Sequence, residues 1–500
     1  MGWAGIGTIL AFLAVPFVSL VAANPGYPFP YGRLLIYYVA LGAPLTASVW
    51  FVTRRSSDSG QRFVAFLSLA IYGLTGLAAD ISRSASFTTW AVHPVAWIAI
   101  GLIIAAYLVS RWSSVQRFVP VLGFILLAWP LAYVLVDTAA AAQQTEDQAL
   151  DNAWELTPKT TPNIYFFVLD GYAREDVLSE KYSYELQDAF LNDLARRGFS
   201  VAENAIAPYP MSYLSISSTL SGSYAAEEGS DIRDTSRWFP VMQGKSNTVA
   251  TLRQWGYSYA HVPADQWDGT SCSGLEDICL GGESAITATD SVLLQETPFG
   301  IMFNTMTSAR LHAERSDPFR AVTKLLANTP TSPYFAFIHL LNPHPPYFET
   351  GPNCAITRQA YDLAAPWGVD EYANAVECLN RRLLPAIDEI LRVDPTALIV
   401  LQGDHGPNQG VNLFANGDLN DWTSERAWIR FSVLAAMRLP DGCLLPPEVN
   451  TVNTFRIIFN CLAMEEVDLL PSRMWLANNS PGEITEVPIS YARPTSRDDP

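Results

Sequence analysis

The sequence lacks two patterns that would have assigned it to common functional classes. It has no Cys-x-x-Cys pair, which argues against a zinc ribbon and against a thioredoxin-type redox motif. After residue 140 it has no cluster of lysine and arginine, and the whole chain of 500 residues carries a net charge of −18. This second absence argues against nucleic acid as a partner and against a surface that docks on anionic lipid by charge alone.

Charged side chains are scarce at the start of the chain. Residues 1–140 contain no lysine, seven arginines and three aspartates, a net charge of +4, which leaves −22 for the remainder. The same part contains five apolar stretches, each close to the ~20 residues that a membrane-spanning helix needs. We expect transmembrane helices at about residues 3–23, 33–53, 63–80, 91–110 and 117–137. A soluble all-α core is the alternative.

The arginines predict the orientation of these helices. Five of them lie after the second and fourth stretches: Arg54, Arg55, Arg62, Arg111 and Arg117. The loops between hold only two others, so the five-arginine side is expected to be cytoplasmic. The first stretch lacks a basic leader and an Ala-x-Ala cleavage site, so we count it as a span. A multi-pass protein of the cell membrane is predicted, with a cytoplasmic N-terminus and everything after residue 140 on the periplasmic or extracellular side.

The six cysteines all follow residue 270. An even number confined to the part predicted to lie outside favours disulfides formed in an oxidising compartment. Fifteen connectivities are available to six cysteines. We favour pairing in sequence order, with buried free thiols as the alternative: Cys272–Cys279, Cys354–Cys378 and Cys443–Cys461.

The sequence divides into four segments. Residues 1–137 form the predicted transmembrane domain, and residues 138–161 form a juxtamembrane helix and linker. From residue 162, strand-like runs alternate with helical stretches such as 185–197 and 371–392. Such alternation is typical of βαβ units, so we predict an α/β/α domain with a mainly parallel sheet over residues 162–478. Residues 479–500 read as a polar tail.

Three buried strand-like runs end in potential metal ligands. The run 164–169 is followed by Asp170, and the run 334–341 leads into Asn-Pro-His344. The run 397–401 precedes Asp404 and His405. Because ligands gather beyond the carboxyl ends of the strands in open α/β sheets, these side chains predict a metal site and an enzyme.

Ser212 lies two residues after Pro210, which disfavours helix just before it. A hydroxyl at the start of a helix lies in positive potential beside free N–H groups. The local sequence fits a nucleophile and a simple N-cap equally well.

Together these motifs resemble the alkaline phosphatase superfamily, in its sulfatase-like branch, over about residues 160–475. Asp170 matches the family's first metal-binding acid, and Asp-His-Gly at 404–406 matches its late metal-binding pair. The nucleophile segment of sulfatases ends in a Leu-Thr-Gly-like turn ten residues after the nucleophile. Here Leu-Ser-Gly at 220–222 ends ten residues after Ser212, which selects Ser212 over the serines at 215, 217 and 218.

The departures from this branch limit the chemistry. Sulfatases oxidise the Cys or Ser of a C/S-x-P-x-R motif to formylglycine, whereas residues 212–216 read Ser-Tyr-Leu-Ser-Ile, so we expect no formylglycine. Six histidines leave no complete second metal site of the two-metal phosphatase type. We predict one divalent cation on Asp170, Ser212, Asp404 and His405, with Mn²⁺ or Zn²⁺ favoured over Mg²⁺ or Ca²⁺.

Five spans before a sulfatase-like domain resemble lipoteichoic acid synthases and lipid A phosphoethanolamine transferases. The resemblance implies transfer of phosphoglycerol or phosphoethanolamine from a phospholipid donor at the bilayer to an envelope glycan or lipid, through a covalent serine intermediate. Those enzymes use Thr where this chain has Ser212, and the synthases use Glu where it has Asp170. The alternatives are a sulfatase-like hydrolase or phosphodiesterase, and a non-catalytic protein of envelope assembly. The sequence does not indicate an oligomeric state.

Further side chains are candidates for binding substrate. The segment from His339 to Tyr347 resembles the family's loop that contacts the transferred group, in which His344 would bind a phosphoryl oxygen or protonate the leaving oxygen. His339 would support it or bind substrate. Arg174 and Arg426 could clamp a phosphate, and so could the arginine at 456. A structural histidine or a structural ion pair is the alternative for each. The histidines at 261 and 312 have no motif context.

Overall fold

The computed structural model describes most of the chain after residue 152. The described ranges are 27–29, 31–53, 153–184, 187–232, 235–264, 267–281, 317–328, 333–345, 352–354, 368–407, 422–478 and 483–492, together with single residues or pairs at 14, 17–18, 21–22, 24, 128, 131–132, 289 and 347. The chain divides into two compact units, Met1–Gln143 with Ile286–Arg310 and Gln144–Ala285 with Leu311–Pro500.

In the first unit, α2 runs from Tyr31 to Thr53 and contains the predicted span 33–53. The predicted spans 63–80 and 91–110, and most of 3–23 and 117–137, lie outside the described residues. Within the part of the chain that the structure describes, no helix has both the length and the apolar character needed to cross a bilayer. The five-span bundle therefore stays a prediction.

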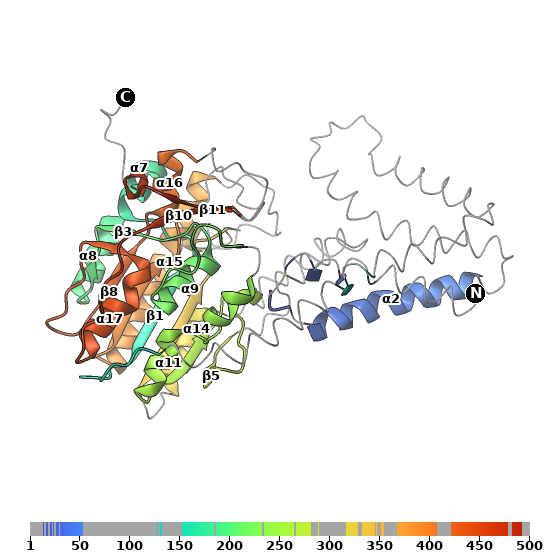
Figure 1. Cartoon of the computed structure of the whole chain (residues 1–500), viewed down its shortest axis with the longest axis horizontal. Coiled ribbons are helices and arrows are strands. Elements are labelled where there is room, and N and C mark those ends of the chain that lie inside the picture. Colours follow the sequence, from blue (N-terminus) through green and yellow to red (C-terminus); the bar gives the residue numbers. More distant parts are fainter. Residues whose placement is uncertain are drawn as a thin grey trace. The chain divides into compact units, whose positions relative to one another are not determined.

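The second unit is built on a seven-stranded sheet, and the predicted mainly parallel sheet is confirmed (Figure 1). In chain order its strands are β1 Ile164–Leu169, β2 Ser200–Val201, β4 Ser258–Val262, β5 Ile278–Cys279, β6 Tyr334–Leu340, β7 Leu398–Gly403 and β8 Ala435–Arg438. Their order across the sheet is β2-β8-β7-β1-β6-β4-β5. The five strands from β7 to β5 are parallel, and β8 and β2 close the other edge with antiparallel pairs.

Helices cover both faces of this sheet because side chains alternate along each strand. Tyr165 and Phe167 of β1 point into the larger core cluster. That core is covered by α7 Glu175–Tyr182, α8 Gln187–Arg196, α14 Pro318–Ala327 and α15 Val369–Val393. The helices predicted at 185–197 and 371–392 correspond to α8 and α15.

The opposite face presents aromatic side chains to a second helical layer. Phe166 of β1 stacks on Phe337 of β6, with ring centroids 5.7 Å apart, and meets Phe455 of α17 edge to face. This layer contains α9 Ser212–Ser221, α10 Phe239–Met242, α11 Asn247–Gln254 and α17 Thr454–Leu462. It is the face that carries the functional side chains described below.

Smaller elements complete the unit. They are α16 Ser424–Phe431, the pairs β3 Asn204–Ile206 with β9 Glu448–Asn450 and β10 Met474–Asn478 with β11 Glu483–Val487, and the 3₁₀ turns Thr235–Arg237, Asp268–Thr270, Pro352–Cys354, Thr451–Asn453 and Ile489–Ala492. The folded domain thus runs past the predicted end at residue 478. The segment after this last hairpin is held on the domain at Ala492, whose carbonyl accepts hydrogen bonds from Arg174 and Ser432.

The end of the predicted linker packs on the domain. Lys159 N–H donates to the Leu462 carbonyl, and Trp154 N–H donates to the Thr251 hydroxyl. The Trp154 ring lies against Phe459 and over Gly222, the residue that caps the C-terminus of α9. Residues 138–152 of that linker lie outside the described residues.

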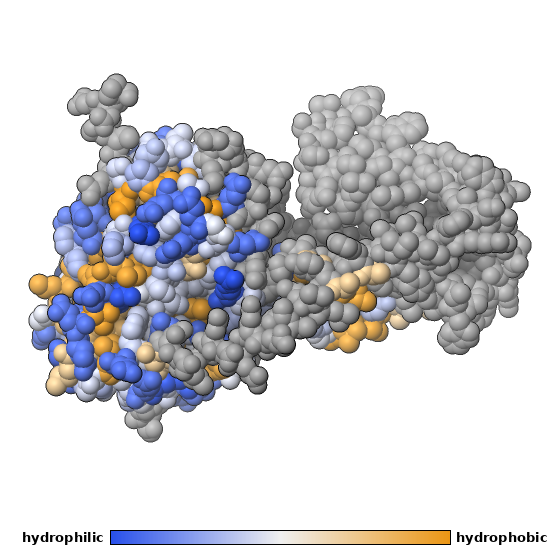
Figure 2. Space-filling model, in the orientation of Figure 1, coloured by the Kyte–Doolittle hydropathy of each residue, from blue (hydrophilic) through white to orange (hydrophobic). Residues whose placement is uncertain are grey.

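All three predicted disulfides are present: Cys272–Cys279, Cys354–Cys378 and Cys443–Cys461. Figure 2 shows that hydrophilic side chains cover most of the coloured surface of the second unit in that view, with apolar patches between them. This polar surface agrees with the negative charge of the sequence after residue 140.

Candidate metal centre and nucleophile

The two predicted metal-binding acids lie side by side at the carboxyl edge of the sheet. Strand β1 is in parallel register with β7, Leu169 opposite Gly403, so the next residues are Asp170 and Asp404. Both side chains are buried, with 3% and 1% exposure. Asp404 Oδ1 accepts the N–H groups of Gly171 and His405 at 3.0 and 2.9 Å, which leaves Oδ2 to face the site.

His405 presents a ring nitrogen to these carboxylates. Its Nδ1 lies 3.0 Å from the Gly406 carbonyl and donates to it, so the lone pair of the neutral ring is on Nε2. This Nε2 atom lies 3.6 Å from Asp170 Oδ1 and 3.5 Å from Asp404 Oδ2. Gly406 must be glycine here, because a Cβ would lie 2.0 Å from the Ile429 carbonyl oxygen.

Ser212 begins α9 and points at the same group. The N-cap of α9 is Met211 and no side chain caps the helix, so the N-cap interpretation of Ser212 is wrong. Its Oγ instead lies 3.0 Å from His405 Nε2. The competing serines 215, 217 and 218 donate to carbonyls elsewhere, at Tyr209, Trp238 and Leu214 respectively.

A closed set of hydrogen bonds fixes α9 against β7. The Thr454 hydroxyl donates to Gln402 Oε1, and Gln402 Nε2 donates to the Thr219 hydroxyl at 3.1 Å. Thr219 in turn donates to the Thr451 carbonyl at 3.1 Å. Gln402 precedes Asp404 by two residues, so the helix that carries Ser212 and the strand that carries the metal-binding pair are joined through buried polar groups.

The electrostatics of the site call for a cation. Burial opposes the charge of Asp170, but His344 and His339 outweigh it and hold the pKa of Asp170 below its usual value. Burial and the Asp170 carboxylate raise the pKa of Asp404 to about 8. Burial, followed by the charge of Arg430, lowers the pKa of His405 well below its ordinary value, so this imidazole is neutral. Two buried carboxylates beside neutral imidazole are a ligand set that a divalent cation would satisfy.

Unpaired atoms and their spacing also fit a cation. Within the described residues, Asp170 Oδ1, Asp404 Oδ2 and His339 Nε2 are buried and have no hydrogen-bond partner. Two ligands about 2.1 Å from one cation lie about 3.0 Å apart at a right angle and about 3.4 Å apart at a tetrahedral angle. The separations of 3.0 to 3.6 Å from His405 Nε2 to Ser212 Oγ, Asp170 Oδ1 and Asp404 Oδ2 are of that size.

Arg430 joins the nucleophile loop to the metal-binding loop. It lies in α16, is 6% exposed, and donates through Nε and Nη2 to the Pro210 carbonyl and through Nη1 to the Gly406 carbonyl. Burial lowers the pKa of Arg430 to about 10, so it stays charged at neutral pH. The sequence analysis missed this residue. Its signal in the sequence is its place in α16, where Ala427, Trp428 and Phe431 are also buried.

Residues 162–427 match the family described as Sulfatase, which is more than half of the chain. The chain belongs to the sulfatase family. The predicted relationship to the alkaline phosphatase superfamily is thereby confirmed. No curated protein matches the chain in sequence.

Several solved structures are similar to this sulfatase-family chain. The C-terminal periplasmic domain of EptC from Escherichia coli is 11% identical, with a TM-score of 0.43, and the match covers 68% of this chain and 96% of that one. The lipooligosaccharide phosphoethanolamine transferase A (EptA) of Neisseria meningitidis, an integral membrane protein, is 13% identical, with a TM-score of 0.37 and coverages of 87% and 88%. The periplasmic domain of the phosphoethanolamine transferase EptC from Campylobacter jejuni is 13% identical, with a TM-score of 0.37 and coverages of 60% and 89%.

The structure brings both candidate histidines of β6 and its loop to this centre. His344 is half-buried; its Nδ1 contacts the Pro345 carbonyl, and its ring lies 6.2 Å from that of His405. His339 is fully buried, with Nε2 3.5 Å from Asp170 Oδ2. Among the histidines without motif context, His261 lies in the core at 0% exposure, and the histidine at 312 lies outside the described residues.

The candidate arginines are engaged in other contacts. Arg174 is buried and binds both Asp176 oxygens and the carbonyls of Ala205 and Ala492. Arg456 donates to the Gly222 and Asp468 carbonyls, and the backbone N–H of Arg426, in the first turn of α16, donates to the Thr423 hydroxyl. For Arg174 and Arg456 these bonds support the structural alternative, so we do not include them in the function proposed below.

Proposed function

We propose that this chain is a metal-dependent phosphoryl-headgroup transferase. It takes phosphoglycerol or phosphoethanolamine from a phospholipid, holds it covalently on Ser212, and passes it to a hydroxyl of an envelope glycan or lipid. The observation that carries the proposal is the position of Ser212, whose Oγ lies at the start of α9 and 3.0 Å from His405 Nε2, beside two buried carboxylates.

An unmodified hydroxyl favours phosphoryl transfer over sulfate-ester hydrolysis. Residues 212–216 lack the Pro and Arg of the sulfatase motif, so Ser212 is expected to keep its hydroxyl. A serine oxygen activated by a neighbouring cation suits a covalent phospho-enzyme. When bound, a divalent cation would lower the pKa of the hydroxyl and neutralise charge on the phosphoryl oxygens. Asp170, Asp404, His405 and Ser212 would hold it.

In the first half of the proposed reaction, the Ser212 hydroxyl loses its proton to solvent and Oγ attacks phosphorus. The bond between phosphorus and the oxygen of the diacylglycerol moiety breaks, and His344 gives a proton to that oxygen, so the lipid leaves as diacylglycerol. In the second half, an acceptor hydroxyl loses its proton to His344 and attacks phosphorus. The bond between phosphorus and Oγ breaks, and Ser212 recovers a proton from solvent. His344 suits both steps because an imidazole nitrogen can donate a proton in one step and accept it in the other.

The proposed location is the outer side of the cell membrane. The three disulfides agree with an oxidising compartment. The predicted N-terminal spans would keep the domain beside its lipid donor and raise the effective donor concentration.

The test follows the headgroup in vesicles. Full-length protein is reconstituted with phosphatidylethanolamine or phosphatidylglycerol that carries an isotope label in the headgroup, with Mn²⁺ or Zn²⁺ and with or without a glycolipid acceptor. We expect cation-dependent release of diacylglycerol by wild type, with the label recovered on the acceptor. Ser212→Ala should abolish release. Ser217→Ala is the matched control, because it removes a hydroxyl of the same helix that donates to Trp238.

Two outcomes would replace the proposal. Free labelled headgroup released in step with diacylglycerol, even when acceptor is present, would make the protein a phosphodiesterase. No diacylglycerol from wild type that has bound its cation would leave the hydrolysis of other envelope esters, or a non-catalytic role, as the account.

A further inference from the structure

His339 is held rigidly on the face of the sheet that carries the metal-binding residues. It is the next-to-last residue of β6 and pairs in register with Val168 of β1, two residues before Asp170. Because side chains alternate along a strand, His339 shares its face with Phe337, and their rings stack at a centroid distance of 6.3 Å. The Trp267 ring also packs on this imidazole, edge to face, at a centroid distance of 5.5 Å.

The Nε2 atom of this ring has no hydrogen-bond partner in the part of the chain that the structure describes, and the residue is 0% exposed. Its nearest charged neighbour is Asp170 Oδ2 at 3.5 Å, which is long for a hydrogen bond. A buried polar atom without a partner is costly, and each such atom in a native protein needs an explanation such as an ion. The 3.5 Å separation equals that between His405 Nε2 and Asp404 Oδ2 at the predicted cation site.

The other ring nitrogen has a partner that can accept a hydrogen bond from it. His339 Nδ1 lies 3.3 Å from the hydroxyl oxygen of Thr270, which is itself fully buried. That oxygen also accepts the Ala264 N–H at 3.1 Å. When Nδ1–H donates to Thr270, the lone pair of the ring is on Nε2, the atom directed at Asp170. Such an outer hydrogen bond is the usual way in which proteins orient a metal-binding histidine.

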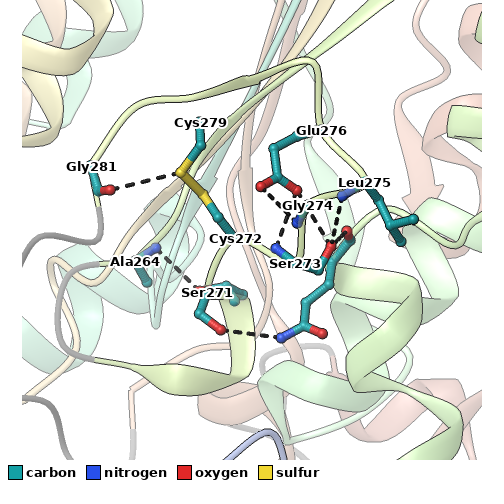
Figure 3. The surroundings of a disulfide bond; sticks show 11 residues. Ala264, Ser271, Cys272, Ser273, Gly274, Leu275, Glu276, Cys279 and Gly281 are labelled. Atoms are coloured by element: carbon teal, nitrogen blue, oxygen red, sulfur yellow. Dashed lines mark hydrogen bonds between the residues drawn. A yellow bond between two sulfur atoms is a disulfide. The ribbon is translucent and has the colours of Figure 1, made fainter. Parts of the chain in front are cut away.

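The loop after Thr270 is fixed by covalent and polar contacts. Cys272 and Cys279 form a disulfide across it, as Figure 3 shows. Within the loop, the Glu276 carboxylate accepts the N–H groups of Ser273 and Gly274 at 3.2 and 3.1 Å. The disulfide therefore restrains the loop that begins two residues after Thr270.

We infer that His339 is a further protein ligand of the cation, through Nε2, in addition to Asp170, Ser212, Asp404 and His405. Ligand atoms of Asp170, His339 and Asp404 all lie within 4.8 Å of one another. His339 approaches Oδ2 of Asp170, whereas His405 approaches Oδ1, so the two imidazoles flank one carboxylate. The set then contains two imidazoles, two carboxylates and a hydroxyl, which favours Zn²⁺ or Mn²⁺ over Mg²⁺ or Ca²⁺.

This assignment replaces a substrate-binding role for His339. The ring is enclosed by Phe337, Trp267 and Asp170, whereas His344 is half-buried. The inference rests on the proposed function only because both assume that a divalent cation binds at this site.

The experiment counts the imidazoles on bound zinc. Full-length protein in detergent is loaded with one equivalent of Zn²⁺, and X-ray absorption fine structure is recorded for wild type, His339→Gln, His344→Gln and His261→Gln. His261 is the matched control, because it is equally buried and stacks on the same Phe337 ring from strand β4. A competition titration with a chelating dye gives the zinc dissociation constant of each protein.

We expect two imidazoles in wild type, in His344→Gln and in His261→Gln, and one in His339→Gln. The dissociation constant should rise at least about tenfold in His339→Gln. Thr270→Val, which removes only the Nδ1 partner, should keep two imidazoles and weaken zinc binding by about tenfold.

One imidazole in wild type, or two retained in His339→Gln, would overturn the inference. The wild-type count does not depend on any variant folding. It also needs no turnover, so a failure of the proposed transferase activity would be seen separately, in the vesicle assay.

Discussion

Replacing Arg430 should lower both the stability of the domain and the rate of transfer, and the loss of rate should exceed what the loss of stability explains. The guanidinium makes three hydrogen bonds, two to the carbonyl of Pro210 before Ser212 and one to the carbonyl of Gly406 after His405. Arg430→Met removes all three donors and leaves two carbonyls without them. A buried carbonyl that loses its donor costs roughly 1–3 kcal/mol, so for two carbonyls we expect the free energy of unfolding to fall by about 2–6 kcal/mol.

The effect on transfer should be larger than stability alone explains. With the bridge gone, the Ser212 loop and the His405 loop can shift independently, and a displacement of about 1 Å can cost about a hundredfold in rate. The loss of a positive charge beside Asp404 and Asp170 favours cation binding, so the zinc affinity of Arg430→Met should stay within about tenfold of wild type. We therefore expect kcat to fall about a hundredfold while zinc stays bound, with partial recovery on adding guanidinium.

Arg438 offers a matched control at the other end of the sheet. Its guanidinium also makes three hydrogen bonds to carbonyls, those of Arg197, Ala397 and Pro395. Arg438→Met should lower the free energy of unfolding in urea titrations. Its kcat, calculated per folded molecule, should equal that of wild type. Equal effects of the two variants on kcat, or an Arg430→Met that transfers at the wild-type rate, would refute the positioning role.

Three further predictions concern stability. Burial lowers the pKa of His261 to about 3, below the ordinary 6.5, so between these two pH values the unfolded chain binds a proton that the folded chain does not. The free energy of unfolding should therefore fall below about pH 6.5, by up to about 1.4 kcal/mol per pH unit. In urea titrations, His261→Phe should reduce this dependence on pH. Replacing both Cys272 and Cys279 by serine opens a short loop and should cost about 2.5 kcal/mol in the same assay, whereas an unchanged midpoint would deny the loop a structural role. At Gly222, where φ is +60°, an added Cβ would lie 2.5 Å from the Trp154 ring. Gly222→Ala should lower the free energy of unfolding by about 1–3 kcal/mol. The loss should be smaller in a Trp154→Ala background, because the clash with the ring is then removed.

Local patterns were sufficient to predict the centre of the fold. The runs that became β1, β6 and β7 are short, apolar and followed by polar side chains, so periodicity and strand-end reasoning placed Asp170, Asp404 and His405 at one edge. Pro210 marked the start of α9, but the choice of Ser212 within that segment came from the resemblance to sulfatases. The disulfides followed from cysteines close in sequence.

Contacts between distant segments could not be predicted in this way. Arg430 bridges two loops that only the tertiary fold brings together, and its burial among apolar residues of α16 cannot be read from a charge pattern. Arg174 looked available for phosphate, yet Asp176, two residues on, binds its guanidinium. Strand β11 lies in the predicted polar tail, because most of its residues are polar and exposed and Ile484 alone is buried.

The most direct test of the account is the mass of the protein during turnover. Wild type, Ser212→Ala and Ser217→Ala are mixed with phospholipid and Mn²⁺ or Zn²⁺, quenched in acid within milliseconds to seconds, and examined by intact and peptide mass spectrometry. The account predicts an adduct with the mass of phosphoethanolamine or phosphoglycerol on the peptide that contains Ser212, in wild type and Ser217→Ala only. An adduct on another residue, or undiminished diacylglycerol release by Ser212→Ala, would contradict it.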